Sequence, residues 1–165
     1  FSYHKNSGSI ALLIAIIFII VIETIAFHIL LLKWSNIAAW FLTGISIYSG
    51  IQIFGFIKSM YQRPISISNN KLFLRYGIMN ETIINIKEIE SIEISSKDIV
   101  LDEKTKKLSF LGELESHNII IHLKTENSLI GLYGFKKKFK VLALHIDNKI
   151  DFVNQVNILL KNREL

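Results

Sequence analysis

Two long runs of apolar residues fill the first third of the chain, and a short polar connection separates them. The first run, Ile10 to Leu32, is interrupted in polarity only by Glu23, Thr24 and His28, and the second, Ile37 to Ile57, carries no charge. At about 1.5 Å per residue, a helix of either length covers the roughly 30 Å hydrocarbon core of a bilayer. The connection is too short for anything but an antiparallel hairpin. We therefore predict two membrane spans.

The polar residues of the first span are the candidates for intramembrane chemistry. Glu23 lies near its middle, where a charged carboxylate costs about 2.5–3.5 kcal/mol on insertion scales. Three hypotheses account for Glu23: it is structural, with a hydrogen bond to Tyr48 or a hydroxyl of the second helix; it faces a partner subunit together with His28; or both serve a proton relay or membrane enzyme. Thr24 and His28 share a helix face, whereas Glu23 and His28 lie about 140° apart, which does not suit one metal ion.

Small residues form a stripe along the second span. Ala39, Thr43, Ser46 and Gly50 follow one another at spacings of four, three and four, which places them on one helix face. In lipid, such a stripe lets another helix approach closely. It is therefore either the packing face against the first span or the docking face of a partner.

Beyond Pro64, the only proline, the spacing of apolar residues changes from helical to alternating. Segments 65–68 and 72–76 flank Asn69 and Asn70, a pair typical of a tight hairpin turn. A turn at 77–80 follows. Further short strands are expected, all antiparallel, with a charged loop at 102–107 and a turn at Glu126 and Asn127; they lie at 82–86, 89–94, 118–124, 128–133 and 141–146.

The end of the chain returns to helical spacing. Asp147 is expected to cap a helix of about residues 148–163, whose inward side includes Ile150, Val153 and Val156. The whole pattern predicts an α+β membrane protein. Its parts are a transmembrane hairpin, residues 1–60 with spans at about 10–32 and 37–57, and a β domain, residues 61–165.

Two stretches of the β domain carry a resemblance. The run Arg63 to Gly77, with its Leu-Phe-Leu-Arg-Tyr-Gly hairpin strand, and the run Ile83 to Ile92 resemble the opening of bacterial pleckstrin-homology-like (PH-like) domains that follow a transmembrane helix pair. The last apolar strand and its helix, with Phe152 and Val153, are similar to the capping helix of that family. The resemblance implies a PH-like antiparallel β-barrel or sandwich with a C-terminal capping helix. Such domains bind lipids or peptides or act as scaffolds, and the resemblance carries over no catalytic residue.

Composition narrows the classes of function. Half of the residues are apolar, and there is no cysteine, which excludes disulfides and thiolate chemistry. The chain after Arg63 has nearly balanced charge, which excludes the strongly basic field of nucleic-acid-binding proteins. No catalytic, phosphate-binding or zinc-binding motif is present. We therefore predict no catalytic residue, no metal and no cofactor.

The basic residues suggest an orientation and a surface. Lys5, Lys58 and Arg63 flank the spans on the side of the termini, and Lys33 alone lies in the connection, which favours termini and β domain in the cytoplasm. The densest basic run is interleaved with phenylalanines and comprises Lys136, Lys137, Lys138 and Lys140. Near an anionic bilayer each lysine contributes about 1 kcal/mol of attraction. The alternative for this run is a solvated loop between strands.

These observations lead to one functional prediction and one alternative. We predict a non-enzymatic accessory or scaffold protein, multi-pass in a bacterial inner membrane, whose β domain binds a protein partner or the membrane surface. It would act as a subunit of a membrane complex or as a homo-oligomer. The alternative is a membrane-embedded enzyme or proton-coupled subunit that uses Glu23 and His28.

Overall fold

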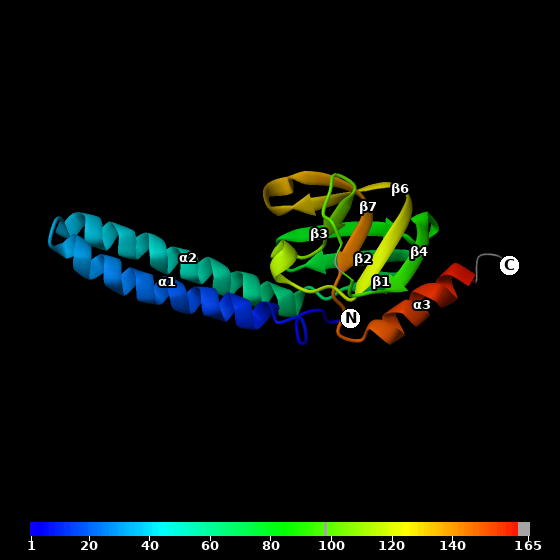
Figure 1. The fold of residues 1–165 in the computed structure, drawn as a ribbon, viewed down its shortest axis with the longest axis horizontal. Coiled ribbons are helices and arrows are strands. Elements are labelled where there is room, and N and C mark those ends of the chain that lie inside the picture. The colour runs from blue at the N-terminus through cyan, green and yellow to red at the C-terminus, as the bar shows by residue number, and fades with distance from the viewer. Residues whose placement is uncertain (98, 162–165) are drawn as a thin grey trace.

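The computed structural model describes residues 1–97 and 99–161 and consists of a helix hairpin joined to a β domain (Figure 1). Helix α1 is Ser9–Leu32 and helix α2 is Asn36–Gln62, capped by Ser35, whose hydroxyl accepts a hydrogen bond from the Ala38 N–H. Both helices are long and apolar enough to span a membrane, and only 6% of the apolar window of each is buried. A core helix of a soluble protein would be mostly covered, so this exposure favours lipid as their surroundings.

The β domain contains seven strands in the described part of the chain, arranged in one mixed sheet in the order β1-β2-β3-β6-β7-β5, with β4 paired to β6. The strands are β1 Ser66–Ser68, β2 Lys71–Tyr76, β3 Asn80–Asn85, β4 Ile89–Ile94, β5 Thr105–Lys107, β6 Ile119–Gly131 and β7 Lys136–Leu144. Short 3₁₀ turns lie at Ile86–Glu88, Gly112–Leu114 and Leu132–Gly134.

The sheet differs from the closed antiparallel barrel or sandwich that the resemblance implied. It is an open path rather than a closed barrel, and β5, within the expected charged loop, pairs with β7 in parallel. One edge of β6 is shared by two neighbours, because β4 pairs with its first half and β3 with its last two residues. The sheet therefore bends around β6 without closing.

Two local predictions are wrong for the same strand pair. The expected turn at Glu126 and Asn127 does not exist, since β6 runs through it with a register shift against β7 between His122 and Asn127. A bulge of this kind bends a strand without ending it. Strand β7 begins at Lys136, so the basic run is part of a strand and not a loop.

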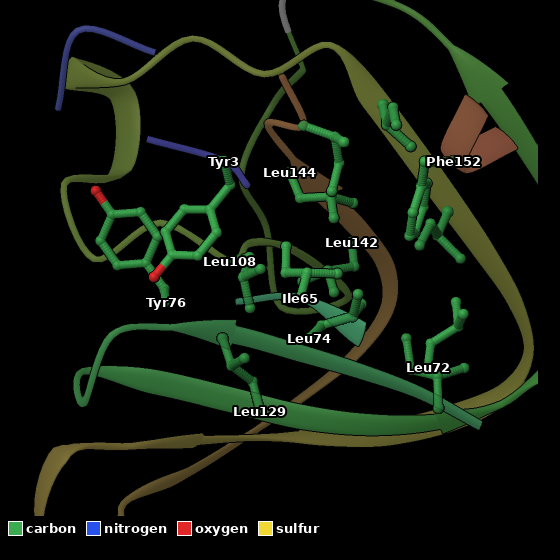
Figure 2. Close-up of a cluster of buried hydrophobic side chains, with 14 of the residues drawn as sticks. Tyr3, Ile65, Leu72, Leu74, Tyr76, Leu108, Leu129, Leu142, Leu144 and Phe152 are labelled. Atoms are coloured by element: carbon green, nitrogen blue, oxygen red, sulfur yellow. The ribbon is translucent and has the colours of Figure 1, made fainter. Parts of the chain in front are cut away.

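The core lies between the bent sheet, helix α3 (Lys149–Lys161) and the segment before α1 (Figure 2). Its labelled members in the figure come from strands β2, β6 and β7, from the residues next to β1 and β5, from the N-terminal segment and from α3: Tyr3, Ile65, Leu72, Leu74, Tyr76, Leu108, Leu129, Leu142, Leu144 and Phe152. Helix α3 covers one side through Phe152, Val153 and Val156, whereas Ile150 is 60% exposed, contrary to the expected inward stripe. Residues 162 and 163 of the expected helix lie outside the described residues.

The segment before α1 packs on the β domain rather than extending from the hairpin. The Ile65 N–H donates to the Phe1 carbonyl, and the Asp147 N–H donates to the Ser2 carbonyl, each at 3.0 Å. The Asp147 carboxylate accepts from the backbone N–H groups of Lys5 and Asn6, and the side chain of Asn148, not Asp147, accepts the N–H of Asp151 at the start of α3. The expected cap residue therefore holds the N-terminal segment instead.

Candidate functional site

The turn between β2 and β3 is pressed against the end of α2. Gly77 has a φ of +53°, and a Cβ at this position would lie 2.5 Å from Ser59 Oγ and 2.8 Å from the Phe56 ring. Ser59 donates its hydroxyl to the Phe56 carbonyl (2.7 Å) and accepts the N–H of Ile78 (3.2 Å). Only glycine combines this backbone conformation with so close an approach. The turn and the helix end therefore form one packed unit.

Both backbone groups of Gly77 are also held by side chains from outside the turn. Its N–H donates to Tyr3 Oη at 2.7 Å, and its carbonyl accepts from Arg63 Nη1 at 3.0 Å. Arg63 also makes an ion pair with Glu81, with 2.6 Å between Nη2 and Oε2. These bonds join the N-terminal segment, the residue after α2 and the β2–β3 hairpin at one point. We call Tyr3, Phe56, Ser59, Arg63 and Gly77 the junction.

A buried acid lies behind the junction. Glu115 is 2% exposed, and its Oε2 accepts hydrogen bonds from Tyr76 Oη and Ser109 Oγ. The ring centroids of Tyr3 and Tyr76 are 5.5 Å apart, and Figure 2 shows the two rings side by side. Burial raises the pKa of Tyr3 to about 12, and burial together with the nearby Glu115 carboxylate raises the pKa of Tyr76 above its ordinary value. Both phenols therefore stay protonated as donors at neutral pH.

Inside the hairpin, Glu23 lines an open groove of about 400 Å³ between α1 and α2. The opposite wall includes the hydroxyls of Ser46 and Ser49. Among the described residues, Glu23 makes no hydrogen bond or ion pair, and Tyr48, one of the partners expected for it, is 62% exposed. The carboxylate is therefore presented to whatever occupies the groove.

The other polar residues of the spans face one another. His28 Nδ1 lies 2.8 Å from Thr43 Oγ1, whose hydroxyl donates to the Ala39 carbonyl, so the histidine is the donor of the pair. Thr24 donates its hydroxyl to the Ile20 carbonyl within α1. The groove that Glu23 lines does not include His28, as expected from their angular separation.

The small-residue stripe lies along the seam between the helices. Ala39 is fully buried, and Thr43 contacts His28 of α1. Around Gly50, however, a second groove of about 270 Å³ remains between the helices, and a Cβ on Gly50 would meet nothing within 4 Å. The stripe thus faces α1 without producing the close backbone approach that small residues permit.

The basic run lies on β7 and divides into two parts. Lys136, Lys137 and Lys138 stand near the turn that joins β6 and β7, while Phe139 is fully buried. Lys140 lies farther along the strand, where its N–H donates to the carbonyl of Lys104. Lys138 pairs with Glu126 at 3.7 Å.

The histidines of the β domain do not form a metal centre. No group of three or more potential metal ligands occurs among residues 1–97 and 99–161. His4 and His145 are largely buried, and burial lowers the pKa of both below the ordinary value, although Asp147 acts in the opposite direction. They are therefore neutral at neutral pH.

Comparisons add no relative. No protein-family model matches the chain, and neither a curated protein nor a solved structure matches it.

The junction is the feature that sequence reasoning missed. The sequence predicts Gly77 only as a turn residue, and no local pattern marks Tyr3, Tyr76 or Glu115 as partners. A local signal existed for Gly77 alone, because a glycine after an alternating strand favours a positive φ.

Proposed function

We propose that the chain is a non-enzymatic, membrane-anchored accessory or scaffold protein. Its helix hairpin would hold a PH-like β domain at the cytoplasmic surface of a bacterial inner membrane, where the domain binds a protein partner or the membrane surface. In support, two candidate spans are joined to a mixed β-sheet with a C-terminal helix. The order of elements, a strand hairpin first and a packed helix last, fits the PH-like resemblance, although the sheet is open.

The single observation that carries this proposal is the junction. A domain on a flexible tether samples all orientations, and its binding surfaces are not aimed at the bilayer. Here α2 continues to Gln62, and Gly77 packs directly on Phe56 and Ser59. The N-terminal segment adds a second attachment through Tyr3. A scaffold benefits from an anchor that also orients its domain, because its binding surface then faces a fixed direction relative to the bilayer. A soluble catalyst does not need such an orientation.

The buried polar groups at the junction and behind it support the non-enzymatic assignment. The Tyr3 hydroxyl accepts a backbone N–H, and the Glu115 carboxylate accepts from Tyr76 and Ser109, so these groups are engaged in structure. Catalytic groups instead face a space that a substrate can enter. We therefore assign the network a stabilising role.

Labelling of single cysteines tests the topology, because the 165-residue sequence contains no cysteine. Asn36→Cys, at the first residue of α2 next to the connection between the helices, should react with a membrane-impermeant maleimide on intact cells. Asp102→Cys, on the exposed β5 side of the β domain, should react only after lysis. Reaction of the second variant on intact cells would refute the cytoplasmic placement.

Purification at native expression level in mild detergent tests the accessory role. We expect a defined membrane protein to co-purify with the natural chain and to be lost from Gly77→Ala, which disturbs the junction. Gly112→Ala, with a similar φ of +58° and open space around its Cβ, is the matched control. A monomeric chain without a partner would contradict the subunit role.

A second candidate function is proton coupling through Glu23, and the groove favours it. A carboxylate on an open groove beside two serine hydroxyls is accessible to a proton or to a partner's side chain. Glu23→Gln should then abolish the activity of the complex while leaving its assembly intact. Loss of assembly would instead assign Glu23 to helix contacts.

A further inference from the structure

Exposed apolar side chains gather on three neighbouring turns of the β domain. Tyr133 and Phe135, in the turn between β6 and β7, are 86% and 71% exposed, and Phe110 and Leu114, in the segment before Glu115, are 58% and 75% exposed. Ile78, in the β2–β3 turn, is 49% exposed. We call these five residues the apolar tip. Five large apolar side chains in water on one end of a domain mark a contact surface.

The contacts of the β2–β3 turn determine how far the apolar tip lies from the membrane-spanning part of the helices. Ile57 is the last residue of the uncharged stretch of α2, and the Ile78 N–H bonds to Ser59, two residues later. The turn therefore stands at the depth at which the apolar span ends, which is the headgroup region of a bilayer.

The β6–β7 turn stands next to this level. Asn80 pairs with Gly131, and Met79 lines one hollow together with Phe110, Tyr133 and Phe135. Figure 1 agrees, since the β6–β7 turn points to the end of the domain from which α1 and α2 leave.

Tyr133 has a backbone conformation that disfavours its own residue type. Its φ is +59°, in the left-handed region that glycine or asparagine occupies most readily, and its side chain contributes almost no burial. The exposed ring of Tyr133 therefore does not stabilise the isolated β domain. Tyrosine is, by contrast, a preferred residue at membrane interfaces, with its ring among the acyl chain ends and its hydroxyl in water.

The charges around the apolar tip favour an anionic surface. Lys136 and Lys137 follow Phe135 directly and are exposed, and among the described residues neither makes an ion pair with an acid. Lys138 is partly neutralised by Glu126, and Glu113 lies beside Leu114 as the opposing charge. Two free lysines beside five apolar side chains match a layer of anionic headgroups over acyl chains.

We propose that the apolar tip inserts into the headgroup layer of the same bilayer that the helices span, with Lys136 and Lys137 on anionic phospholipids. The proposal rests on the proposed function, because it requires the hairpin to lie in a membrane. The bilayer is the occupant that the geometry favours: the surface begins at the level where α2 leaves the apolar layer and faces the same side. Insertion would add a third attachment to the two at the junction.

Single-cysteine variants of the full chain in vesicles test this. Tyr133→Cys, Ile78→Cys and, on the far side of the domain, Ile158→Cys in α3 are labelled with the environment-sensitive dye NBD; Ile158 is 56% exposed. Each is reconstituted into phosphatidylcholine vesicles with or without phosphatidylglycerol, including spin-labelled lipids as quenchers. We expect a blue shift and several-fold stronger quenching at 133 than at 158 in anionic vesicles. Lys136→Gln and Lys137→Gln should each reduce the ratio of inserted to free tip about fivefold.

The three positions separate the possible failures. Ile78 belongs to the turn that packs on α2, so quenching at 78 without quenching at 133 would overturn the insertion of the rest of the apolar tip and leave the oriented domain intact. Equal exposure to water at 78, 133 and 158 would overturn the proposed function as well. If a co-purified membrane protein, and not lipid, shields position 133, the surface is a protein-docking site and the lipid proposal is refuted.

Discussion

Gly77→Ala is the substitution that most directly tests how the β domain is joined to the helices. The added Cβ would stand 2.5 Å from Ser59 Oγ and 2.8 Å from the Phe56 ring. Neither neighbour can move freely, because Ser59 is held by hydrogen bonds to the Phe56 carbonyl and the Ile78 N–H, and Phe56 is 2% exposed. The turn must therefore separate from α2 or distort.

Two contributions set the magnitude of the loss. A non-glycine residue at φ +53° costs on the order of 1 kcal/mol. Forcing an extra methyl group into a packed contact costs about 1–3 kcal/mol more. We expect Gly77→Ala to lower the free energy of unfolding of the β domain by roughly 2–4 kcal/mol. Gly112→Ala has nearly the same φ, +58°, and nothing within 4 Å of its Cβ, so it should cost only about 1 kcal/mol.

Pulse proteolysis in urea, on the full chain in mild detergent, measures this free energy through the fraction of β domain that resists cleavage. The difference between the two variants isolates the contact with α2. Adding Ser59→Ala to Gly77→Ala should recover part of the loss, since the closest atom is removed. Equal losses for Gly77→Ala and Gly112→Ala would refute the close packing of the turn on the helix.

Three further predictions use the same assay or a close variant. Tyr76→Phe should lower the free energy of unfolding by about 1–3 kcal/mol, because buried Glu115 loses a hydrogen-bond donor. Tyr61 is 59% exposed, so Tyr61→Phe should be neutral. Burial lowers the pKa of His145 in the folded state, so the unfolded chain binds this proton at a higher pH than the folded chain does. The free energy of unfolding should therefore fall as the pH drops below about 6.5, by at most about 1.4 kcal/mol per pH unit. His145→Gln should reduce this dependence on pH. Gly50→Ala should leave the resistance of the hairpin to SDS unchanged or raise it by up to about 1 kcal/mol, and a loss would contradict the open space at Gly50.

Elements with local signals could be predicted from the sequence. The two helices follow from long, mainly apolar runs, and β4 occupies the predicted residues, Ile89–Ile94. Asn69 and Asn70 both have positive φ, 48° and 58°, as the predicted tight turn requires. In each case a few consecutive residues determine the conformation, so the pattern is sufficient.

Elements decided by distant partners could not be predicted. Strand β7 includes Lys136 to Lys140 and buries Phe139 among them, whereas the four lysines are exposed and resemble a loop in the sequence. Strand β6 continues through Glu126 because a register shift against β7 absorbs the irregularity. The parallel pairing of β5 is likewise set by its neighbour and not by its own residues.

The junction could not be predicted from the sequence for the same reason, because its partners lie even farther apart along the chain. The bond from Gly77 to Tyr3 spans 74 residues, and that from Tyr76 to Glu115 spans 39. No periodic pattern reports such pairs. The His28–Thr43 contact joins residues only 15 positions apart, on the two helices of the hairpin. The sequence nevertheless suggested a hydroxyl of α2 as the hydrogen-bond partner of Glu23 and not of His28.

Mutations can distinguish the contacts that orient the β domain from the surface that binds lipid, because the two lie at different residues. Only residues 63–65 connect α2 to β1, and the N-terminal segment returns to the same end of the domain through Tyr3 and Asp147. Two attachments at one end restrict rotation of the domain more than one does, because a single short connection still acts as a hinge. A substitution at Gly77 should therefore weaken lipid contact and partner binding together, whereas Lys136→Gln should weaken lipid contact alone. Partner binding that survives loss of the junction would mean that the helices, through Glu23 and its groove, carry the recognition instead.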